Sequence, residues 1–457
     1  MSSITQFKEL MSISPIDGRY GNLMCSMQEI FSEYALIKLR LEIEVDYFLF
    51  LTEIIPELSS ISNEKKVLVN GLKQFTLLNA EEIKNIERRL NHDVKAVEVY
   101  LRNKFKEFGL EEYCNFIHFG LTSQDVNSLA YVTQLWYFKQ KMYSPLINSV
   151  METLKGMGEK YANIPMLSRT HGQPATPTIL GKELMVFWYR LKTQYTTLRK
   201  YNYKTKFGGA VGNLNAHYLA YPEIDWNKQL ADFVNIFAYN RGFAMGRNIY
   251  TTQIDNYDNY AEFFDVIRRV NTVLIDSCQD FWLYISRDYF KIKVVEGEVG
   301  SSAMPHKVNP ICFENAEGNL GVSNALLDFL SSKLPVSRLQ RDLTDSTVIR
   351  NVGVAFSHTI LALKNIERGL HQLEVNELAI NSDLERNHVV VSEAIQTLLR
   401  KENLPEAYDM VKDFTRTGMS ITKSDMVEFI DSLDINKKLK DQLKKITPKS
   451  YAKSKSY

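Results

Sequence analysis

One stretch in the second half of the chain combines side chains that can do chemistry. Residues 300–315 read GSSAMPHKVNPICFEN and follow a glycine-rich approach, EGEVG. Ser301 or Ser302 could act as a nucleophile or a base, although neither fits a GxSxG elbow and no Ser-His-Asp order is evident. Lys307 and Asn309 supply donors for a carboxylate or an oxyanion. The glycines predict a mobile loop that closes over a ligand.

A second polar segment, NFIHFGLTSQDVNS at 115–128, contains Thr122 and Ser123 just before Asp125. The structural interpretation is an N-cap, in which these residues start a helix at about residue 126. The functional interpretation is that the hydroxyls and free N–H groups of a helix start hold an anion. Both interpretations stay open at this point.

The segment MLSRTHGQPATPTILG, at 166–181, places a histidine in a proline-containing loop before a long helix. A lone histidine is usually structural. His171, however, stands beside Arg169, Thr170 and Gln173 in what we expect to be a rigid loop. Because histidine titrates near neutral pH, it is a natural general acid.

Two smaller clusters complete the set. RLNHDVKA, at 89–96, puts His92 and Asp93 together inside a helical pattern. RLQRDLTDSTVIRN, at 338–351, carries a hydroxyl among three basic residues: Arg338, Arg341, Ser346 and Arg350. Such a set near a helix start is a credible phosphate grip. The alternative is a solvated face with salt bridges.

Several common site types are missing from the sequence. It has no P-loop, no Rossmann GxGxxG after a strand, no HExxH and no clustered metal-ligand spacing. We therefore expect an enzyme without a metal or organic cofactor.

His306 is interpreted as a loop residue. The remaining histidines are treated as structural or unassigned: His118, His217, His358, His371 and His388.

Bulk composition limits the class of protein. The 457 residues are 45% hydrophobic and 24% charged with a net charge of +1, which is typical of a globular protein and argues against a nucleic-acid binder. No run of about 18 apolar residues predicts a membrane span, and the first residues do not resemble a secretory signal. The four cysteines are scattered, which favours reduced, buried thiols. These features predict a cytoplasmic protein without a membrane partner.

Helical periodicity runs through nearly the whole chain. Apolar residues recur at steps of three and four over 180–198, 263–284 and 349–370, which predicts long helices packed as a bundle. Strand signals are weak, so the predicted fold class is all-α, and FGGAVGNLNAHY at 207–218 is the main irregular insert. We expect three domains: an N-terminal helical domain (1–110), a central helical bundle (111–365) and a C-terminal helical domain (366–457).

Three motifs together resemble one superfamily. GSSAMPHKVNP is similar to the signature loop of the fumarase/aspartase superfamily, GSSxMPxKxNP, and SRTHGQPATP and GLTSQDVN are similar to its other two motif regions. Within it the chain resembles the adenylosuccinate lyase family in its bacterial-type form, through SPIDGRYG, NHDV, THGQPATP and DSTVIRN. Argininosuccinate lyases and fumarases typically have Leu-Gln where this chain has Gly172 and Gln173. The resemblance runs from about residue 13 to about residue 450.

The resemblance implies an all-α, three-domain subunit in a homotetramer, with each active site built from three subunits. It implies a β-elimination that releases fumarate from adenylosuccinate, leaving AMP. It also implies release of fumarate from SAICAR, leaving AICAR. Both reactions belong to purine biosynthesis and need no cofactor. The rival interpretations are another lyase of the same superfamily, and a helical scaffold protein that has lost catalysis.

The resemblance also implies roles for individual residues. Ser301 is the base and His171 the acid. Substrate contacts are implied for the residues carried over from the motifs: Arg19, Tyr20, Asn91, His92, Asp93, Thr122, Ser123, Gln253, Ser302, Lys307, Asn309, Asn315, Arg341, Ser346 and Arg350. In this set the 5′-phosphate is held by Arg19, Tyr20, Arg341, Ser346 and Arg350. The succinyl end is held by Thr122, Ser123, Lys307 and Asn309.

Overall fold

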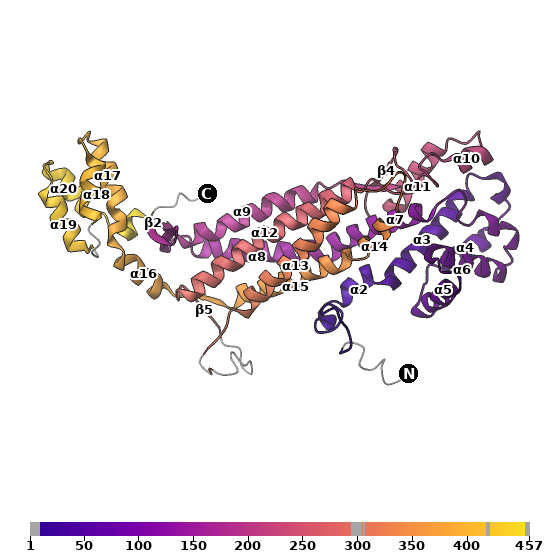
Figure 1. The fold of residues 1–457 in the computed structure, drawn as a ribbon, viewed down its shortest axis with the longest axis horizontal. Helices are drawn as coiled ribbons and strands as arrows, with labels where there is room; N and C mark the ends of the chain where they lie inside the picture. Colours follow the sequence, from indigo (N-terminus) through magenta and orange to yellow (C-terminus); the bar gives the residue numbers. More distant parts are fainter. Residues whose placement is uncertain (1–9, 294–303, 305–306, 417–420, 453–457) are drawn as a thin grey trace. The chain divides into compact units, whose positions relative to one another are not determined.

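The computed structural model describes residues 10–293, 304, 307–416 and 421–452 (Figure 1). Within these residues the chain is helical, as predicted, with six short strands that pair only two by two. No helix in the described part of the chain is long and apolar enough to cross a membrane. Ser301, Ser302 and His306 lie outside the described residues, and so does most of the predicted closing loop.

The contacts group the chain into two compact units, each assembled from three stretches. Unit 1 contains 1–147, 194–272 and 319–362, and unit 2 contains 148–193, 273–318 and 363–457. The three predicted apolar stripes are helices α9 (Leu180–Arg199), α12 (Asp258–Ser286) and α15 (Val352–Gln372). With α8 (Ser144–Lys160) and α13 (Ile311–Lys333) these helices contribute residues to both units. The predicted division into three domains stays a prediction.

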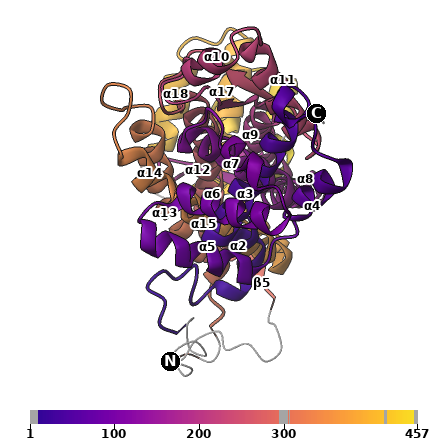
Figure 2. The same ribbon diagram turned by 90° about the vertical axis from the view of Figure 1, so that its right-hand side faces the viewer.

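Unit 1 holds most of the shorter helices. Its remaining elements are η1 (Gly21–Leu23), α2 (Cys25–Phe31), α3 (Glu33–Leu51), η2 (Pro56–Leu58), α4 (Asn63–Gly71), α5 (Leu77–Leu90), α6 (Asp93–Glu107), η3 (Glu111–Phe116), α7 (Ser123–Tyr137), η4 (Phe138–Tyr143), β3 (Tyr203–Lys206), α10 (Asn215–Ala220), α11 (Trp226–Tyr239), β4 (Met245–Asn248) and α14 (Thr344–Ile349). Helix α3 packs against α6 and α7, and these helices lie together in Figure 2. A buried polar triad of Asn271, Ser323 and Thr359 joins the parts of α12, α13 and α15 in this unit.

Unit 2 holds the remaining parts of the long helices. Its other elements are β1 (Pro165–Thr170), β2 (Gln173–Ile179), β5 (Phe290–Ile292), β6 (Leu373–Val375), α16 (Glu377–Arg386), η5 (His388–Val391), α17 (Ser392–Lys401), α18 (Ala407–Thr415), α19 (Lys423–Ser432), α20 (Lys437–Lys444) and α21 (Pro448–Tyr451). Helices α8 and α9 approach so closely that a Cβ on Gly181 would lie 2.2 Å from the carbonyl oxygen of Gly158. The last helices bury their own apolar cluster around Ile395 and Ile430.

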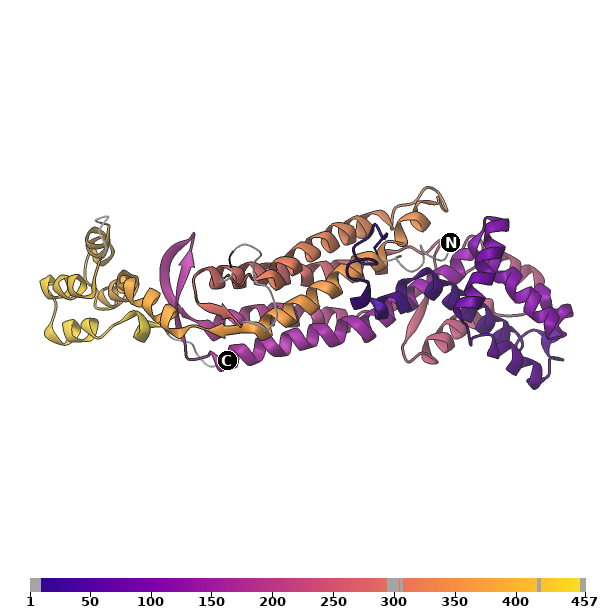
Figure 3. The same cartoon turned by 90° about the horizontal axis from the view of Figure 1, so that it is seen from below.

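Four local predictions were wrong in detail. The expected rigid loop at 166–181 is the antiparallel hairpin β1–β2, drawn as arrows in Figure 3. The insert at 207–218 ends in α10 rather than staying irregular. The expected helix start at about residue 126 is Ser123. The thiol of Cys25 is exposed, whereas Cys114, Cys278 and Cys312 are buried and all four cysteines are free.

Candidate active site

The junction between α5 and α6 presents the NHDV motif. Asn91 ends α5 in a left-handed conformation with φ of 53°, which asparagine tolerates better than most residues. His92 is the N-cap of α6, and its Nδ1 accepts a hydrogen bond from the Lys95 N–H at 3.1 Å. The prediction that these residues lie inside one helix was wrong. Because the helix breaks here, the side chains of Asn91 and His92 lie at a helix end and not on the packed face of a helix, and they can contact a ligand.

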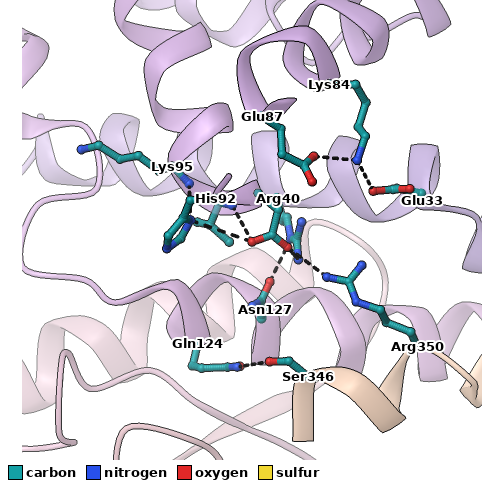
Figure 4. A network of polar contacts seen from close by, with 12 residues as sticks. Glu33, Arg40, Lys84, Glu87, His92, Lys95, Gln124, Asn127, Ser346 and Arg350 are labelled. Carbon is teal, nitrogen blue, oxygen red and sulfur yellow. Dashed lines mark hydrogen bonds and ion pairs between the residues drawn. The ribbon is translucent and has the colours of Figure 1, made fainter. Parts of the chain in front are cut away.

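A carboxylate between two guanidinium groups lies next to this junction. Asp93 Oδ2 accepts from Arg40 at 2.8 Å and from Arg350 at 3.2 Å, as Figure 4 shows around the labelled arginines. Arg40 is 2% exposed and also donates to Asn127 at 2.8 Å. Burial raises the pKa of Asp93, but the two arginines and a hydrogen bond from the Val94 N–H together outweigh burial and hold this pKa below its usual value. The carboxylate therefore fixes Arg350 while compensating a buried charge.

The start of α7 is a capped helix, as the structural interpretation predicted. The backbone N–H of Thr122 donates to Asp125 Oδ2 at 2.7 Å. Asp125 is fully buried, pairs with the Lys206 ammonium at 2.7 Å and accepts from the N–H groups of Gly208 and Gly209. Burial lowers the pKa of Lys206, and Asp125 opposes that shift. The glycine-rich segment thus holds the helix start, and Ser123 faces the cleft.

The predicted phosphate cluster is present on α14 and the segment before it. Arg341 donates to Ser346 Oγ at 3.0 Å and to Gln253 Oε1 at 3.3 Å. Its Nε atom lies 3.8 Å from the carboxylate of Asp345, which is 4% exposed. Gln253 is therefore joined to the cluster through Arg341. Arg338 is instead a solvent-exposed residue whose nearest carboxylate is Asp342, at 3.8 Å.

These groups line one cleft of about 530 Å³ in unit 1. Seven of the predicted residues lie in its wall: Asn91, His92, Asp93, Ser123, Arg341, Ser346 and Arg350. Arg19 and Tyr20 contact each other, with the guanidinium 5.8 Å from the ring centre, but neither belongs to the wall of the cleft. The wall of the cleft combines three guanidinium groups, two carboxylates and the polar groups at the starts of α6 and α7. The guanidinium groups suit a ligand that carries a phosphate.

The cleft also contains residues that the sequence analysis did not select. They are Arg40, Glu87, Asn127, Tyr131, Leu343 and Thr347. Two signals pointed to some of them. Arg40 is a charged residue inside the apolar helix EYALIKLRLEIEVDYFLFL, and a buried charge needs a partner. Residues 123, 127 and 131 are spaced by four and so share one face of α7.

Thr122 and Gln253 also lie in unit 1, whereas His171, Lys307, Asn309 and Asn315 lie in unit 2. His171 and Gly172 form the two-residue turn of the hairpin, with φ of 53° and 75°, as a type I′ turn requires. The His171 side chain is exposed at this tip and makes no hydrogen bond or ion pair with any described residue. Lys307 is also exposed, four residues before α13 begins at Ile311. Asn309 lies between them, and Asn315 on α13 accepts a hydrogen bond from Asn365 at 3.0 Å.

Two histidines outside the predicted set, the partly buried His118 and the fully buried His217, lie close to other titratable side chains of unit 1. His118 Nδ1 lies 2.6 Å from Glu44 Oε1, and although burial lowers its pKa, Glu44 raises it above the usual value. His217 is fully buried, lies 3.0 Å from the Tyr47 hydroxyl, and has its pKa lowered to about 4 by burial. Glycine is required at 120 because a Cβ there would lie 2.5 Å from the His217 ring.

Family models match almost the whole chain. The model described as "Lyase" matches residues 18–323, and the model described as "Adenylosuccinate lyase C-terminal" matches residues 337–452. Among solved structures, a fumarate lyase from Mesorhizobium sp. BNC1 superimposes with a TM-score of 0.73 at 18% identity, covering 93% of this chain and 94% of that chain. A 3-carboxy-cis,cis-muconate lactonizing enzyme from Pseudomonas putida gives 0.73 at 19% identity, covering 93% of each. These structures show the shared fold.

Curated relatives match along nearly their full length. "Adenylosuccinate lyase" of Dictyostelium discoideum is 50% identical over 99% of this chain and 98% of its own. Relatives of the same name from Legionella pneumophila (strain Corby) and Escherichia coli (strain K12) are 46% and 42% identical, over 97% and 98% of this chain and 96% and 97% of their own. The chain therefore belongs to the adenylosuccinate lyase family of the fumarase/aspartase superfamily and is a lyase of purine biosynthesis.

Proposed function

We propose that this lyase removes fumarate from adenylosuccinate, leaving AMP, and from SAICAR, leaving AICAR. One observation supports this most directly: Arg341, Ser346 and Arg350 line the same cleft as His92 and Ser123. Both substrates carry a 5′-phosphate at one end and a succinyl group at the other. A cleft that combines guanidinium groups with helix-start hydroxyl and imidazole groups is complementary to a ligand that carries both a phosphate and carboxylates.

Arg341 is the guanidinium of this cleft that is least tightly paired. Arg40 and Arg350 lie 2.8 Å and 3.2 Å from the Asp93 carboxylate, whereas the hydrogen bonds of Arg341 go to the uncharged acceptors Ser346 and Gln253 and its Nε lies 3.8 Å from Asp345. We propose that Arg341 keeps part of its charge for a ligand. We assign Arg19 and Tyr20 to the same phosphate, and this assignment requires them to come from another subunit or to move toward the cleft.

A hydrogen bond fixes the orientation of the His92 ring at the start of α6. Its Nδ1 accepts a hydrogen bond from the Lys95 N–H, so the proton of the neutral ring is on Nε2. That N–H is the only ring donor in this state, and we propose that it donates to the substrate. Thr122 and Ser123 hold the succinyl carboxylate, helped by the positive end of the α7 dipole. Asn91, Gln253 and Asn315 are further proposed substrate contacts.

The elimination needs a base for the C–H bond that breaks on one carbon and an acid for the nitrogen that leaves the neighbouring carbon. Ser301 takes the proton from the carbon next to a succinyl carboxylate, which leaves an aci-carboxylate dianion. Lys307 and Asn309, with Ser302, stabilise that charge. The C–N bond then breaks as His171 gives a proton to the leaving nitrogen, and the electron pair of the broken C–H bond becomes the fumarate double bond. The steps are two proton transfers and the cleavage of one C–N bond. They involve no net oxidation or reduction, so the proposed mechanism uses no cofactor.

We propose that the site is shared among subunits of a homotetramer. The cleft lies in unit 1, whereas His171 and Lys307 are exposed residues of unit 2. We propose that these two side chains contact a substrate bound in the cleft of another subunit. The long helices carry the surface for association. Large apolar side chains are exposed on α9, α12 and α13: Val186, Tyr189, Trp282, Leu283, Val322 and Phe329. Exposed apolar side chains on packed helices favour burial against further helices.

We further propose that the protein works in the cytoplasm and that the subunit has the three domains 1–110, 111–365 and 366–457. Three buried thiols and one exposed thiol, none in a disulfide, suit a reducing compartment. Cell fractionation tests the location, and limited proteolysis at the proposed boundaries tests the domains.

A direct assay tests the reaction. Purified protein is mixed with adenylosuccinate without added metal, and AMP and fumarate are followed together. Release of both in equal amounts supports the proposal, and persistence in the presence of a chelator supports the absence of a metal requirement. If neither appears, argininosuccinate and aspartate are tested, because activity on either would show that the arginine cluster does not bind a nucleotide phosphate. Inactivity on all three would favour a non-catalytic scaffold.

A further inference from the structure

A glutamine outside the wall of the cleft connects the start of α7 with α14. Gln124 follows Ser123 on α7, is 2% exposed, and directs its Nε2 toward α14. That nitrogen lies 3.3 Å from Ser346 Oγ and 3.3 Å from Asp345 Oδ2. Figure 4 shows the link between Gln124 and Ser346 below the arginine cluster. The two residues are 222 positions apart in the sequence, so only the fold brings them together.

The orientation of the Gln124 amide follows from its neighbour. Asp345 Oδ2 also accepts from the hydroxyl of Tyr257, at 3.0 Å. A carboxylate oxygen accepts hydrogen bonds, so the NH₂ group of Gln124, and not its carbonyl, must face Asp345. The Gln124 Oε1 atom is buried and has no hydrogen-bond partner among the described residues. A flipped amide would place the Gln124 oxygen against the Asp345 carboxylate. Two acceptor oxygens repel each other and form no hydrogen bond, so the flipped orientation is higher in energy.

The hydrogen bonds at Ser346 can then be counted. A serine hydroxyl has two acceptor positions and one donor proton. Gln124 Nε2 and Arg341 Nη2 are both donors, and they occupy the two acceptor positions at 3.3 Å and 3.0 Å. No described residue accepts a hydrogen bond from the Ser346 hydroxyl. Since Ser346 lines the cleft, its proton points to a ligand there.

We infer that Gln124 is a positioning residue for the phosphate end of the substrate, because it obliges Ser346 to act as a hydrogen-bond donor toward an anion in the cleft. The inference rests on the proposed function, in which that anion is the 5′-phosphate. It assigns a role to a buried side chain that touches no substrate. It also gives the start of α7 a physical connection to the phosphate cluster on α14.

The test compares AMP with adenosine as competitive inhibitors of the full-length enzyme. The ratio of their inhibition constants measures how well the phosphate is recognised. Gln124→Met removes both N–H donors while nearly conserving volume. The expected result is an approximately fivefold loss of the preference for AMP over adenosine, the fold-change that one hydrogen bond commonly contributes. The loss should appear in KM more than in kcat, since the phosphate is remote from the breaking bond.

A double-mutant cycle separates positioning from general damage. In a Ser346→Ala background, Gln124→Met should change the AMP preference less than twofold, because its target hydroxyl is absent. Gln134→Met is the matched control. Gln134 is on the same helix, is 3% exposed, and donates to the Ile30 carbonyl instead. It should lower the melting temperature similarly and leave the AMP preference unchanged.

The outcomes distinguish this inference from the proposed function. If Ser346→Ala leaves the AMP preference intact, the proposed phosphate site is wrong and the inference falls with it. If Ser346→Ala reduces the preference but Gln124→Met does not, the phosphate site stands and the role of Gln124 is overturned. An equal effect of Gln124→Met in both backgrounds would also overturn it, because the glutamine would then act independently of Ser346.

Discussion

Arg350 and Asp93 form an ion pair across 257 positions of sequence, with Nη2 3.2 Å from Oδ2. The same oxygen accepts from the buried Arg40 at 2.8 Å. The carboxylate therefore has two tasks: it neutralises a guanidinium in the interior and it fixes a second guanidinium at the wall of the cleft. The pair links the α5–α6 junction to the end of α14, two segments that carry separate motifs in the sequence.

Asp93→Asn should destabilise the protein and raise KM. Removing the carboxylate leaves Arg40 buried without a counter-charge, which costs roughly 2 kcal/mol of unfolding free energy at a partly exposed pair. Because the pKa of Asp93 is lowered in the folded state, its contribution is present above the unfolded pKa of about 3.9 and is lost as pH falls through the folded value. Urea unfolding of the parent protein and of Asp93→Asn, at pH 7 and at lower pH, measures the loss of unfolding free energy. Steady-state kinetics of the same two proteins measures KM.

The matched control for that substitution is Asp276→Asn. Asp276 pairs with Arg190 between α9 and α12, but the two side chains are 50% and 39% exposed. An exposed pair should contribute less than about 1 kcal/mol. Equal losses for both substitutions would contradict the assignment of Asp93 as the partner of a buried charge.

The buried pair of Asp125 and Lys206 should respond unequally to loss of either partner. Asp125→Asn leaves the fully buried ammonium of Lys206 without its carboxylate and with only the Gly209 carbonyl as an acceptor, with an expected loss of about 3–5 kcal/mol. Lys206→Met should cost less, because the carboxylate keeps the N–H groups of Thr122, Gly208 and Gly209. Denaturant unfolding ranks the two variants. The reverse order would show that the backbone donors do not stabilise Asp125.

Stability should rise with pH between about 4 and 6.5 because of His217. Its folded pKa of about 4 lies below the unfolded value of about 6.5, so the unfolded state binds more protons in this window. The contribution is fully present above pH 6.5, and roughly 2 kcal/mol of it is lost on going from pH 7 to pH 5. His118 acts in the opposite direction, since its pKa is raised.

His217→Gln isolates that effect, because it removes one titrating group and keeps a side-chain donor for Tyr47. The difference in unfolding free energy between variant and parent should shrink at pH 5 relative to pH 7. A difference that does not change with pH would show that His217 has no lowered pKa.

His171→Asn and Ser301→Ala should each lower turnover at least ~10²-fold, as loss of a general acid or base does. If subunits share the site, mixing the two inactive variants restores part of the activity in hybrid tetramers. Each variant dissociated and reassociated alone is the control. No recovery after exchange has been verified with labelled subunits would contradict a shared site.

The sequence by itself determined the features that depend on local pattern. Apolar spacing predicted α9, α12 and α15, since helical periodicity needs no information from distant residues. The motifs pointed to the family because each one is a short, continuous run of residues that can be read without the fold. The hairpin around His171 was missed because Pro174 and Pro177 resemble loop residues, although prolines are tolerated at the edges of a two-stranded sheet.

Only the tertiary structure decided which side chains share the cleft and how they are oriented. Arg40 lies 53 residues from Asp93, and Gln124 lies 221 residues from Asp345. The sequence around Arg40 indicates that a buried charge needs a partner, but it does not say which carboxylate supplies it, and Gln124 leaves no such signal. Hydrogen-bond direction and charge compensation depend on which atoms the fold brings within about 3 Å, and that distance is set by packing between elements far apart in the chain.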